Sequence, residues 1–157
     1  MAAVGAAMYH AIVRRKVLSL FDAINRGDAR PVIDGFAGQF EHIFLGQTAL
    51  GGRRTSRAAI TAWYARLYRL LPDIHFTVER ITVSGTPWNT LAVAEWTETN
   101  SGTDGVRTSA QGIHAVHIAW GKMTRLHICP DTVMLERTLQ RLAAKGVAEA
   151  TAGMIEG

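Results

Sequence analysis

Hydrophobic residues follow two different spacings along this chain, and the change occurs at Pro72. Before it, apolar side chains over residues 9–25 recur at the i, i+4, i+7 and i+8 spacing that is typical of an amphipathic helix. A second stripe with this spacing follows Ser56, whose hydroxyl can cap a helix, and it ends at Pro72. Between these helices we expect a short helix with Pro31 in its first turn, a strand over residues 39–45 and a glycine-rich loop.

After Pro72 apolar and polar residues alternate, which predicts β-strands. The alternation slips by one position between Val78 and Ile81, and such a slip indicates a β-bulge near Glu79 and Arg80. Turn residues divide the rest of this region into further strands over residues 90–99, 106–120 and 123–129.

The predicted order places helices first, then four strands in succession, then a helix that Asp131 or Thr132 can cap. Strands joined by short turns predict an α+β fold in which helices cover one face of an antiparallel sheet. A straight strand over residues 106–120 would be about 50 Å long, too long for a domain of this size. The sheet must therefore curl, with Gly112 as the expected bend, and enclose a concave pocket.

Composition narrows the class of protein further. The 157 residues are 48% hydrophobic and 19% charged, which excludes an intrinsically disordered chain. No apolar run approaches the roughly 18 residues of a membrane span, so we expect no membrane association. Cys129 is the single cysteine, which fits a reducing cytoplasm. We expect one domain over residues 1–157, with its core at about residues 9–145 and both ends flexible.

The last hairpin decides which histidines share a face of the sheet. If Gly121 and Lys122 form a two-residue turn, His114 pairs with Cys129, and His127 is its diagonal neighbour. Because side chains alternate along a strand, one face then carries His114, Val116, Ile118, Arg125, His127 and Cys129.

Two histidines on one concave face can act as general base and general acid near neutral pH. His127 and His114 are therefore candidate catalytic residues, and His42 on the first strand is a third. The alternative is that these histidines are core or rim residues bonded to the backbone. We expect the pocket to be lined by helix aromatics and inward strand residues: Trp63, Tyr64, Trp96, Val116, Ile118, Arg125 and Cys129.

Other chemistry finds little support in the residue pattern. Sequence motifs of serine hydrolases, zinc proteases, phosphate-binding loops and dinucleotide-binding folds are absent, and no metal or cofactor is expected. Among the strand carboxylates, Glu95 interrupts an apolar run and is either buried or the solvent-facing member of the strand.

Basic residues cluster in the glycine-rich loop, at Arg53, Arg54 and Arg57. The cluster is either an anion site at a helix N-terminus or a solvated basic loop. Because no second basic stripe is interleaved with aromatics, we expect no nucleic-acid partner.

Four stretches resemble the SnoaL-like polyketide cyclases of the nuclear transport factor 2 and ketosteroid isomerase superfamily. They are SRAAITAWYARLYRLLPDIHFTVE, AVAEWTET, GIHAVHIAWGKMTRL and PDTVMLERTL. The resemblance implies an α+β cone, in which a curved antiparallel sheet wraps around a pocket, and it implies homodimers. Characterised members include cyclases and isomerases that move a proton next to a carbonyl without a cofactor.

The chain departs from the cyclases of this family at one point. Those enzymes use a pocket aspartate on the last strand as the base, whereas here the last strand reads MTRLHIC and carries no carboxylate. His127 occupies that neighbourhood, with His114 on the partner strand.

Three hypotheses follow. In the first, the protein is a cofactor-free enzyme of the isomerase or cyclase type that acts on a small apolar carbonyl compound. His127 takes a proton, and His114 or His42 donates one or holds the oxyanion. In the second, it binds a hydrophobic small molecule without chemistry. In the third, it is a dimeric interaction module with a vestigial pocket, and it pairs through the outer sheet face around His117 and Leu126.

Overall fold

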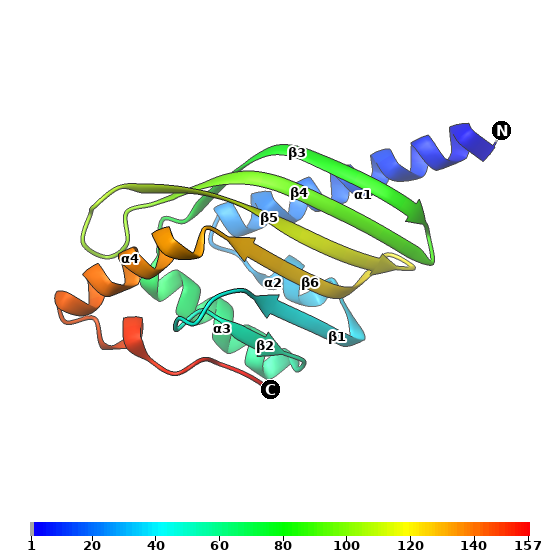
Figure 1. Ribbon diagram of the computed structural model, residues 1–157. Coiled ribbons are helices and arrows are strands. Elements are labelled where there is room, and N and C mark those ends of the chain that lie inside the picture. The colour runs from blue at the N-terminus through cyan, green and yellow to red at the C-terminus, as the bar shows by residue number, and fades with distance from the viewer. Residues whose placement is uncertain (1) are drawn as a thin grey trace.

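A computed structural model describes residues 2–157 and shows a curved six-stranded sheet with helices packed along it (Figure 1). The elements in chain order are α1 (Ala2–Asn25), α2 (Arg30–Asp34), β1 (Phe36–Phe44), β2 (Gly52–Arg54), α3 (Arg57–Leu70), β3 (His75–Thr86), β4 (Asn89–Asn100), β5 (Thr108–Ala119), β6 (Lys122–Pro130), α4 (Thr132–Ala144) and a short 3₁₀ helix, η1 (Ala148–Thr151). The strand order is β2-β1-β6-β5-β4-β3. The predicted α+β class is confirmed.

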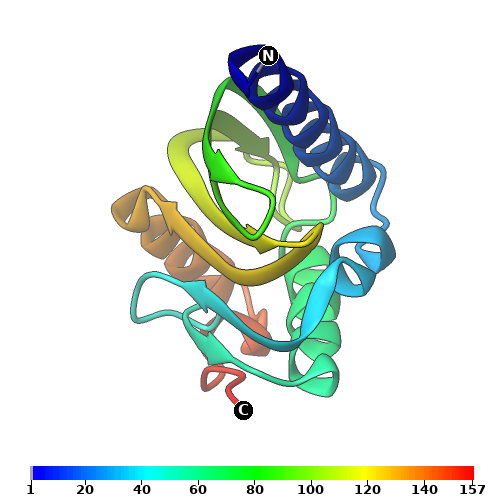
Figure 2. The same ribbon diagram turned by 90° about the vertical axis from the view of Figure 1, so that its right-hand side faces the viewer.

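Most strand pairs are antiparallel, as predicted, but β1 runs parallel to β6. Figure 2 shows how the sheet curls, with α1 and α3 on its concave side. Among residues 2–157, no helix is long and apolar enough to cross a membrane.

The first helix is longer than its apolar spacing predicted. It begins at Ala2 instead of residue 9, because the alanine-rich start favours helix without contributing to the core. Its inner side buries Val13, Val17 and Phe21 against the sheet.

The two predicted helix caps are present. The Ser56 hydroxyl accepts a hydrogen bond from the Ala59 amide at 3.2 Å, and α3 ends at Leu70, before Pro72. A carboxylate oxygen of Asp131 accepts from the Met134 amide at 3.1 Å and starts α4. These caps fix the ends of the two helices that face the interior of the cone.

The sheet itself differs from the prediction in one edge strand. The slip near Glu79 is confirmed as a bulge between Val78 and Arg80. The glycine-rich loop, however, contains β2, in which Arg54 pairs with His42 of β1. Three residues are too few for alternation to reveal a strand.

The register predicted for the last hairpin is wrong by one residue. Its turn consists of Trp120 and Gly121, both with positive φ (52° and 78°), and the register shifts again between His117 and Ile118. His127 is therefore opposite Ala115. Because a shift of one residue moves a side chain to the other face, the predicted set divides between the two faces.

The inner face of this hairpin carries His114, Val116, Ile118, Leu126 and Ile128, whereas the outer face carries His117, Arg125, His127 and Cys129. Leu126 is buried inside the cone. The outer interface proposed around His117 and Leu126 is thus corrected, because only His117 lies on that face.

Candidate functional site

Two narrow cavities lie between the helices and the concave face of the sheet. The first cavity, of about 60 Å³, is bordered by α1, α3, α4 and the middle strands. The second cavity, of about 50 Å³, lies between α1, Gly35 and the β5–β6 hairpin. Both are lined mainly by apolar side chains, and they share Phe21, Ile24, Tyr64 and His114 as a common wall.

His114 stands at the point where the two cavities meet. Its Nδ1 accepts a hydrogen bond from the Trp96 indole N–H at 2.7 Å, so the neutral ring carries its proton on Nε2. Burial beside Phe21 and Phe76 lowers the pKa of His114 to about 3. At neutral pH this side chain is a hydrogen-bond donor and cannot act as a base.

Gly112 allows the Trp96 indole to reach His114. A Cβ atom at Gly112 would lie 2.3 Å from Cη2 of Trp96 and 2.7 Å from the carbonyl oxygen of Cys129. The absent side chain therefore leaves room for the indole to cross β5. This close approach is a use of Gly112 that the sequence did not reveal.

Glu98 is one of the strand carboxylates and lies on the wall of the first cavity, a place that the sequence reasoning did not assign to it. It is 9% exposed, and the Asn100 side-chain amide donates a hydrogen bond to its Oε1 at 2.8 Å. Burial raises the pKa of Glu98 to about 7, although the bond from Asn100 favours the charged form. Glu98 can therefore both accept and release a proton near neutral pH.

A signal for Glu98 was available in the alternation of β4. Ala94 and Trp96 point inward, so the next inward residue is Glu98, whereas Glu95 points outward. On the outer face Glu95 pairs with Arg80, which lowers the pKa of the Glu95 carboxyl.

Tyr64 supplies a second neutral donor between the cavities. Its hydroxyl makes no hydrogen bond with another side chain or backbone group within the described residues 2–157. Burial raises the pKa of Tyr64, so the hydroxyl keeps its proton. The Tyr64 hydroxyl and His114 Nε2 can thus both donate hydrogen bonds to an oxygen atom of a ligand.

His42 also lies on the inner face, but it borders neither cavity. It is fully buried, and its Nδ1 accepts a hydrogen bond from Arg54 Nε at 3.0 Å. Its ring packs edge-on against Trp63 at 4.6 Å between centroids, and its Nε2 has no hydrogen-bond partner among residues 2–157. Burial, with Arg54 second, holds the pKa of His42 well below its usual range.

Arg54 is buried, which corrects both interpretations of the basic loop at this position. Its guanidinium donates to the carbonyl oxygens of Gly51, Gly52 and Ile155 at 2.6–2.9 Å and lies 5.2 Å from the Trp63 ring centre. The other two basic residues of the loop are exposed and make ion pairs: Arg53 with Glu41, and Arg57 with Asp34.

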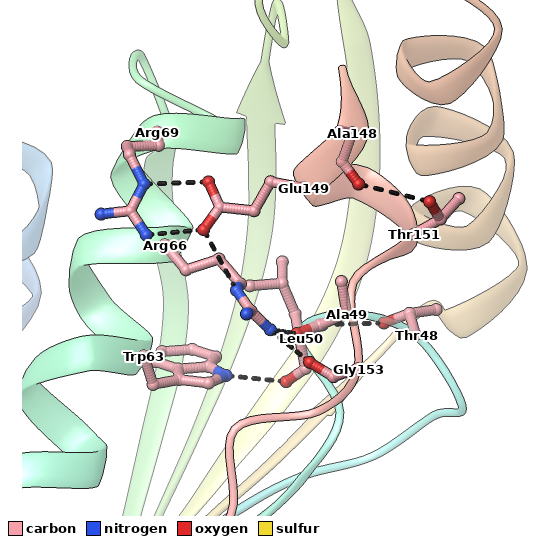
Figure 3. Close-up of polar contacts among 10 residues, drawn as sticks. All are labelled: Thr48, Ala49, Leu50, Trp63, Arg66, Arg69, Ala148, Glu149, Thr151 and Gly153. Atoms are coloured by element: carbon pink, nitrogen blue, oxygen red, sulfur yellow. Dashed lines mark hydrogen bonds and ion pairs between the residues drawn. The ribbon is translucent and has the colours of Figure 1, made fainter. Parts of the chain in front are cut away.

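The C-terminal segment covers Arg54 and is itself held to α3. Glu149 accepts hydrogen bonds from Arg66 and Arg69, and Arg66 also donates to the carbonyl of Gly153 (Figure 3). The residues beyond 145, expected to be flexible, thus form part of the packed structure at this end of the sheet.

The outer face holds the remaining predicted site residues. His127, Arg125 and Cys129 cannot reach either cavity from there, because the sheet lies between. Burial first, and Arg125 second, lower the pKa of His127. Within residues 2–157, no three potential metal ligands come together. Of the predicted pocket residues, Trp63, Tyr64 and Trp96 border the first cavity, and Val116 and Ile118 border the second.

Comparison with known proteins decides the family. Residues 17–126 match the model of the SnoaL-like domain family. The chain belongs to this family. No curated protein matches the sequence of this SnoaL-like domain.

Solved structures share the fold of this SnoaL-like domain at low sequence identity. TerC, co-crystallised with polyporic acid, matches with a TM-score of 0.70 and 19% identity over 80% of this chain and 96% of its own. An NTF2-like protein of unknown function from Burkholderia pseudomallei matches with a TM-score of 0.72 and 16% identity over 80% and 95%. A protein from Jannaschia sp. CCS1 assigned as a SnoaL-like polyketide cyclase matches with a TM-score of 0.59 and 20% identity over 88% and 92%.

Proposed function

We propose that this protein is a cofactor-independent acid–base enzyme of the isomerase or cyclase type, acting on a small apolar carbonyl compound. The observation that carries the proposal is Glu98, a carboxyl group with a pKa of about 7 on the wall of an apolar cavity. A positioned acid or base of this kind contributes about 10²–10⁴-fold to a proton-transfer rate. TerC, which shares the fold, was co-crystallised with polyporic acid, and this supports a small organic ligand.

In the proposed reaction Glu98 takes a proton from a carbon atom conjugated with the carbonyl group. The negative charge moves to the carbonyl oxygen, which His114 Nε2–H and the Tyr64 hydroxyl stabilise as hydrogen-bond donors. The Glu98 carboxylic acid then returns the proton at another carbon. His114 thus keeps the oxyanion role expected from the sequence, while Glu98 replaces His127 as the base.

The spacing of the two groups restricts the substrate. His114 pairs with Ala94, and Glu98 lies four residues further along β4, about 13 Å away at the Cα positions. A conjugated substrate fits this separation, because the carbon that loses its proton is then several bonds from the carbonyl oxygen.

Hydrogen exchange in D₂O tests the proposal without knowledge of the natural substrate. Small open-chain conjugated enones are incubated with the protein, and loss of the exchangeable C–H signals is followed by NMR. We expect Glu98→Gln to slow exchange at least 100-fold, and the wild-type rate to rise with pH through about 7 as Glu98 loses its proton. A folded Glu98→Gln variant with an unchanged rate would show that Glu98 is not the base.

Binding without chemistry is the second candidate function. The apolar lining of both cavities favours it, because an apolar cavity can hold a hydrophobic ligand without any proton transfer. It predicts that wild type and Glu98→Gln bind the same enones with equal affinity and that neither catalyses exchange.

We also infer a homodimer that forms through the outer sheet face, in a cytoplasmic setting that the single free Cys129 supports. Helices α1, α2 and α3 lie on the other side of the sheet in Figure 1, so they leave this face open. Half-buried apolar residues, among them Ile43, Val93 and Ala115, lie near its centre. Light scattering should give twice the 17.1 kDa chain mass, and a value of 17.1 kDa would contradict the dimer.

A further inference from the structure

The β3–β4 and β5–β6 turns each carry an exposed tryptophan, and the two side chains lie next to each other. Trp88 is 59% exposed and Trp120 is 73% exposed, and their ring centres are 5.9 Å apart. The Trp120 amide donates a hydrogen bond to the carbonyl oxygen of Pro87 at 2.7 Å, so the two turns are joined through their backbones. This tryptophan pair borders neither cavity and therefore has no part in the proposed proton transfer.

Packing within the fold explains neither member of the tryptophan pair. Trp120 is the one non-glycine residue with positive φ among residues 2–157, at a turn position that favours glycine or asparagine. The indole N–H groups of buried Trp63 and Trp96 both donate hydrogen bonds, whereas within the same residues those of Trp88 and Trp120 donate none. The pair thus offers two free donors on a large apolar surface, as tryptophans at membrane–water interfaces do.

The first turns of α1 add apolar side chains at the same end of the molecule. Val4, Met8 and Ile12 are exposed and recur every four residues, so they form an apolar stripe along one side of the helix. The Tyr9 hydroxyl is hydrogen-bonded to Thr90 at the start of β4, and this bond holds α1 beside the β3–β4 turn. Figure 1 shows the start of α1 and both turns at the right-hand end of the molecule.

The charge of this end is positive. Arg15 and Lys16 belong to α1, which has no carboxylate before Asp22, and Lys122 follows the β5–β6 turn. Lys16 lies near that turn, because both border the second cavity. Within residues 2–157, none of these three cations forms an ion pair. The Lys122 ammonium group lies 3.3 Å from the backbone carbonyl oxygen of Asp34, whose carboxylate is paired with a residue of α3.

An anionic bilayer surface fits these features better than another protein does. Two copies of this chain docked through this end would bring like charges together. The tryptophan pair projects from the turns, so a protein partner would have to supply a matching hollow, whereas a bilayer closes around inserted side chains. Lipid headgroups also accept hydrogen bonds from indole N–H groups and attract lysine and arginine.

We propose that this end of the molecule binds the surface of an anionic lipid bilayer. The tryptophan pair and the apolar stripe enter the boundary between headgroups and acyl chains, and the three cations contact lipid phosphates. The sequence predicted no membrane association because it contains no spanning run, but binding at a surface requires none. The proposal does not depend on the proposed function, because it uses no residue of the proton transfer.

Flotation with lipid vesicles tests the proposal. We expect wild type to float with vesicles of mixed phosphatidylcholine and phosphatidylglycerol, and not with vesicles of phosphatidylcholine alone. High salt should release the protein, because it screens the attraction between exposed charges. Brominated acyl chains in the anionic vesicles should quench the tryptophan fluorescence, because the inserted indoles then meet the quencher.

The apolar contact is tested by a variant that the fold should accept. Trp120→Gly suits the positive φ of this position, so it should fold at least as well as wild type. It should weaken binding to the anionic vesicles at least about tenfold, because a large apolar side chain can no longer be buried in the bilayer. Leu45→Ser is the matched control, since Leu45 is an exposed apolar residue at the opposite end of the sheet, and it should leave binding unchanged.

The charged contact is tested by a pair of variants at exposed cations. Lys16→Gln should weaken binding to the anionic vesicles about fivefold. Arg137→Gln removes an exposed cation of α4, away from the two turns in Figure 1, and should not change binding.

Three results would overturn the proposal: no flotation of wild type with the anionic vesicles, equal binding by Trp120→Gly and wild type, or a loss in Leu45→Ser as large as that in Trp120→Gly. Light scattering tests a second copy of the chain as the occupant. Self-association that Trp120→Gly removes, without any binding to vesicles, would assign this end to contacts between copies and reject the bilayer.

Discussion

Two histidines on the same concave face, His42 and His114, show how differently one residue type is used in the two halves of this sheet. Both accept a hydrogen bond at Nδ1, His42 from Arg54 and His114 from Trp96. Burial lowers the pKa of both. Yet His42 is sealed in the core, whereas His114 borders two cavities.

The difference comes from what covers each half. At the β1–β2 edge Arg54 fills the space beside His42, and the C-terminal segment closes over Arg54 through the carbonyl of Ile155. At the β4–β5 half, side chains of α1 and α3 lie opposite the sheet and leave room beside His114. A lowered histidine pKa therefore identifies burial, and only the cavity distinguishes a site from a core contact.

The largest expected effect concerns the sealed half. Arg54→Met leaves His42 Nδ1 and three backbone carbonyls without their donor in a buried place, so we expect about 3–5 kcal/mol of destabilisation. Urea unfolding followed by circular dichroism measures it. Arg53→Met is the matched control, because the Arg53–Glu41 pair is exposed and should contribute less than about 1 kcal/mol. Equal effects of the two variants would show that the buried cluster is not what stabilises this edge.

A smaller effect is expected on the pH dependence of folding stability, through His114 in the half of the sheet that borders the cavities. An unfolded histidine binds a proton below about pH 6.5, whereas folded His114 binds one only near pH 3. The unfolded state therefore binds more protons between these values, and stability is lost as pH falls through this range.

His114→Gln removes this titration while its amide oxygen can still accept the Trp96 N–H. Between pH 7 and pH 4 we expect the free energy of unfolding to fall about 3 kcal/mol less in the variant than in wild type. Urea unfolding at both pH values gives the comparison. Parallel losses in the two proteins would mean that His114 is accessible to protons in the folded state.

The smallest effect is expected on the outer face. His127→Gln should change neither the melting temperature by more than about 2 °C nor the rate of deuterium exchange into enones, since a partly exposed side chain outside the cavities contributes little. Differential scanning calorimetry measures the melting temperature, and the NMR assay measures the exchange rate. A loss of exchange with normal folding would return His127 to the site and contradict the observed register.

Local signals were sufficient for much of the fold. The helix stripes, the Ser56 cap and the bulge near Glu79 depend on neighbours in sequence, and all three are confirmed. The family followed from motifs spread over most of the chain. The length of α1 and the presence of β2 were missed because neither depends on a periodic apolar pattern.

The site was harder to predict, because it depends on one residue of register. The turn was placed one position too late, but this error alone would leave His114 and His127 on one face. The register shift between His117 and Ile118 gives β6 one extra residue, and it moves His127 to the outer face. The alternation of β4 was sufficient to predict that Glu98 points inward. Its raised pKa could not be predicted, because it depends on which residues cover the strand.

The sequence by itself determined the elements, their order and the α+β class, because periodicity, caps and turns act over a few residues. Only the tertiary structure decided which polar side chains line a cavity. That outcome depends on strand register, on the indole that crosses Gly112 and on the C-terminal segment that seals Arg54 but leaves His114 open. Contacts of this kind join residues far apart in the chain, so no local pattern encodes them.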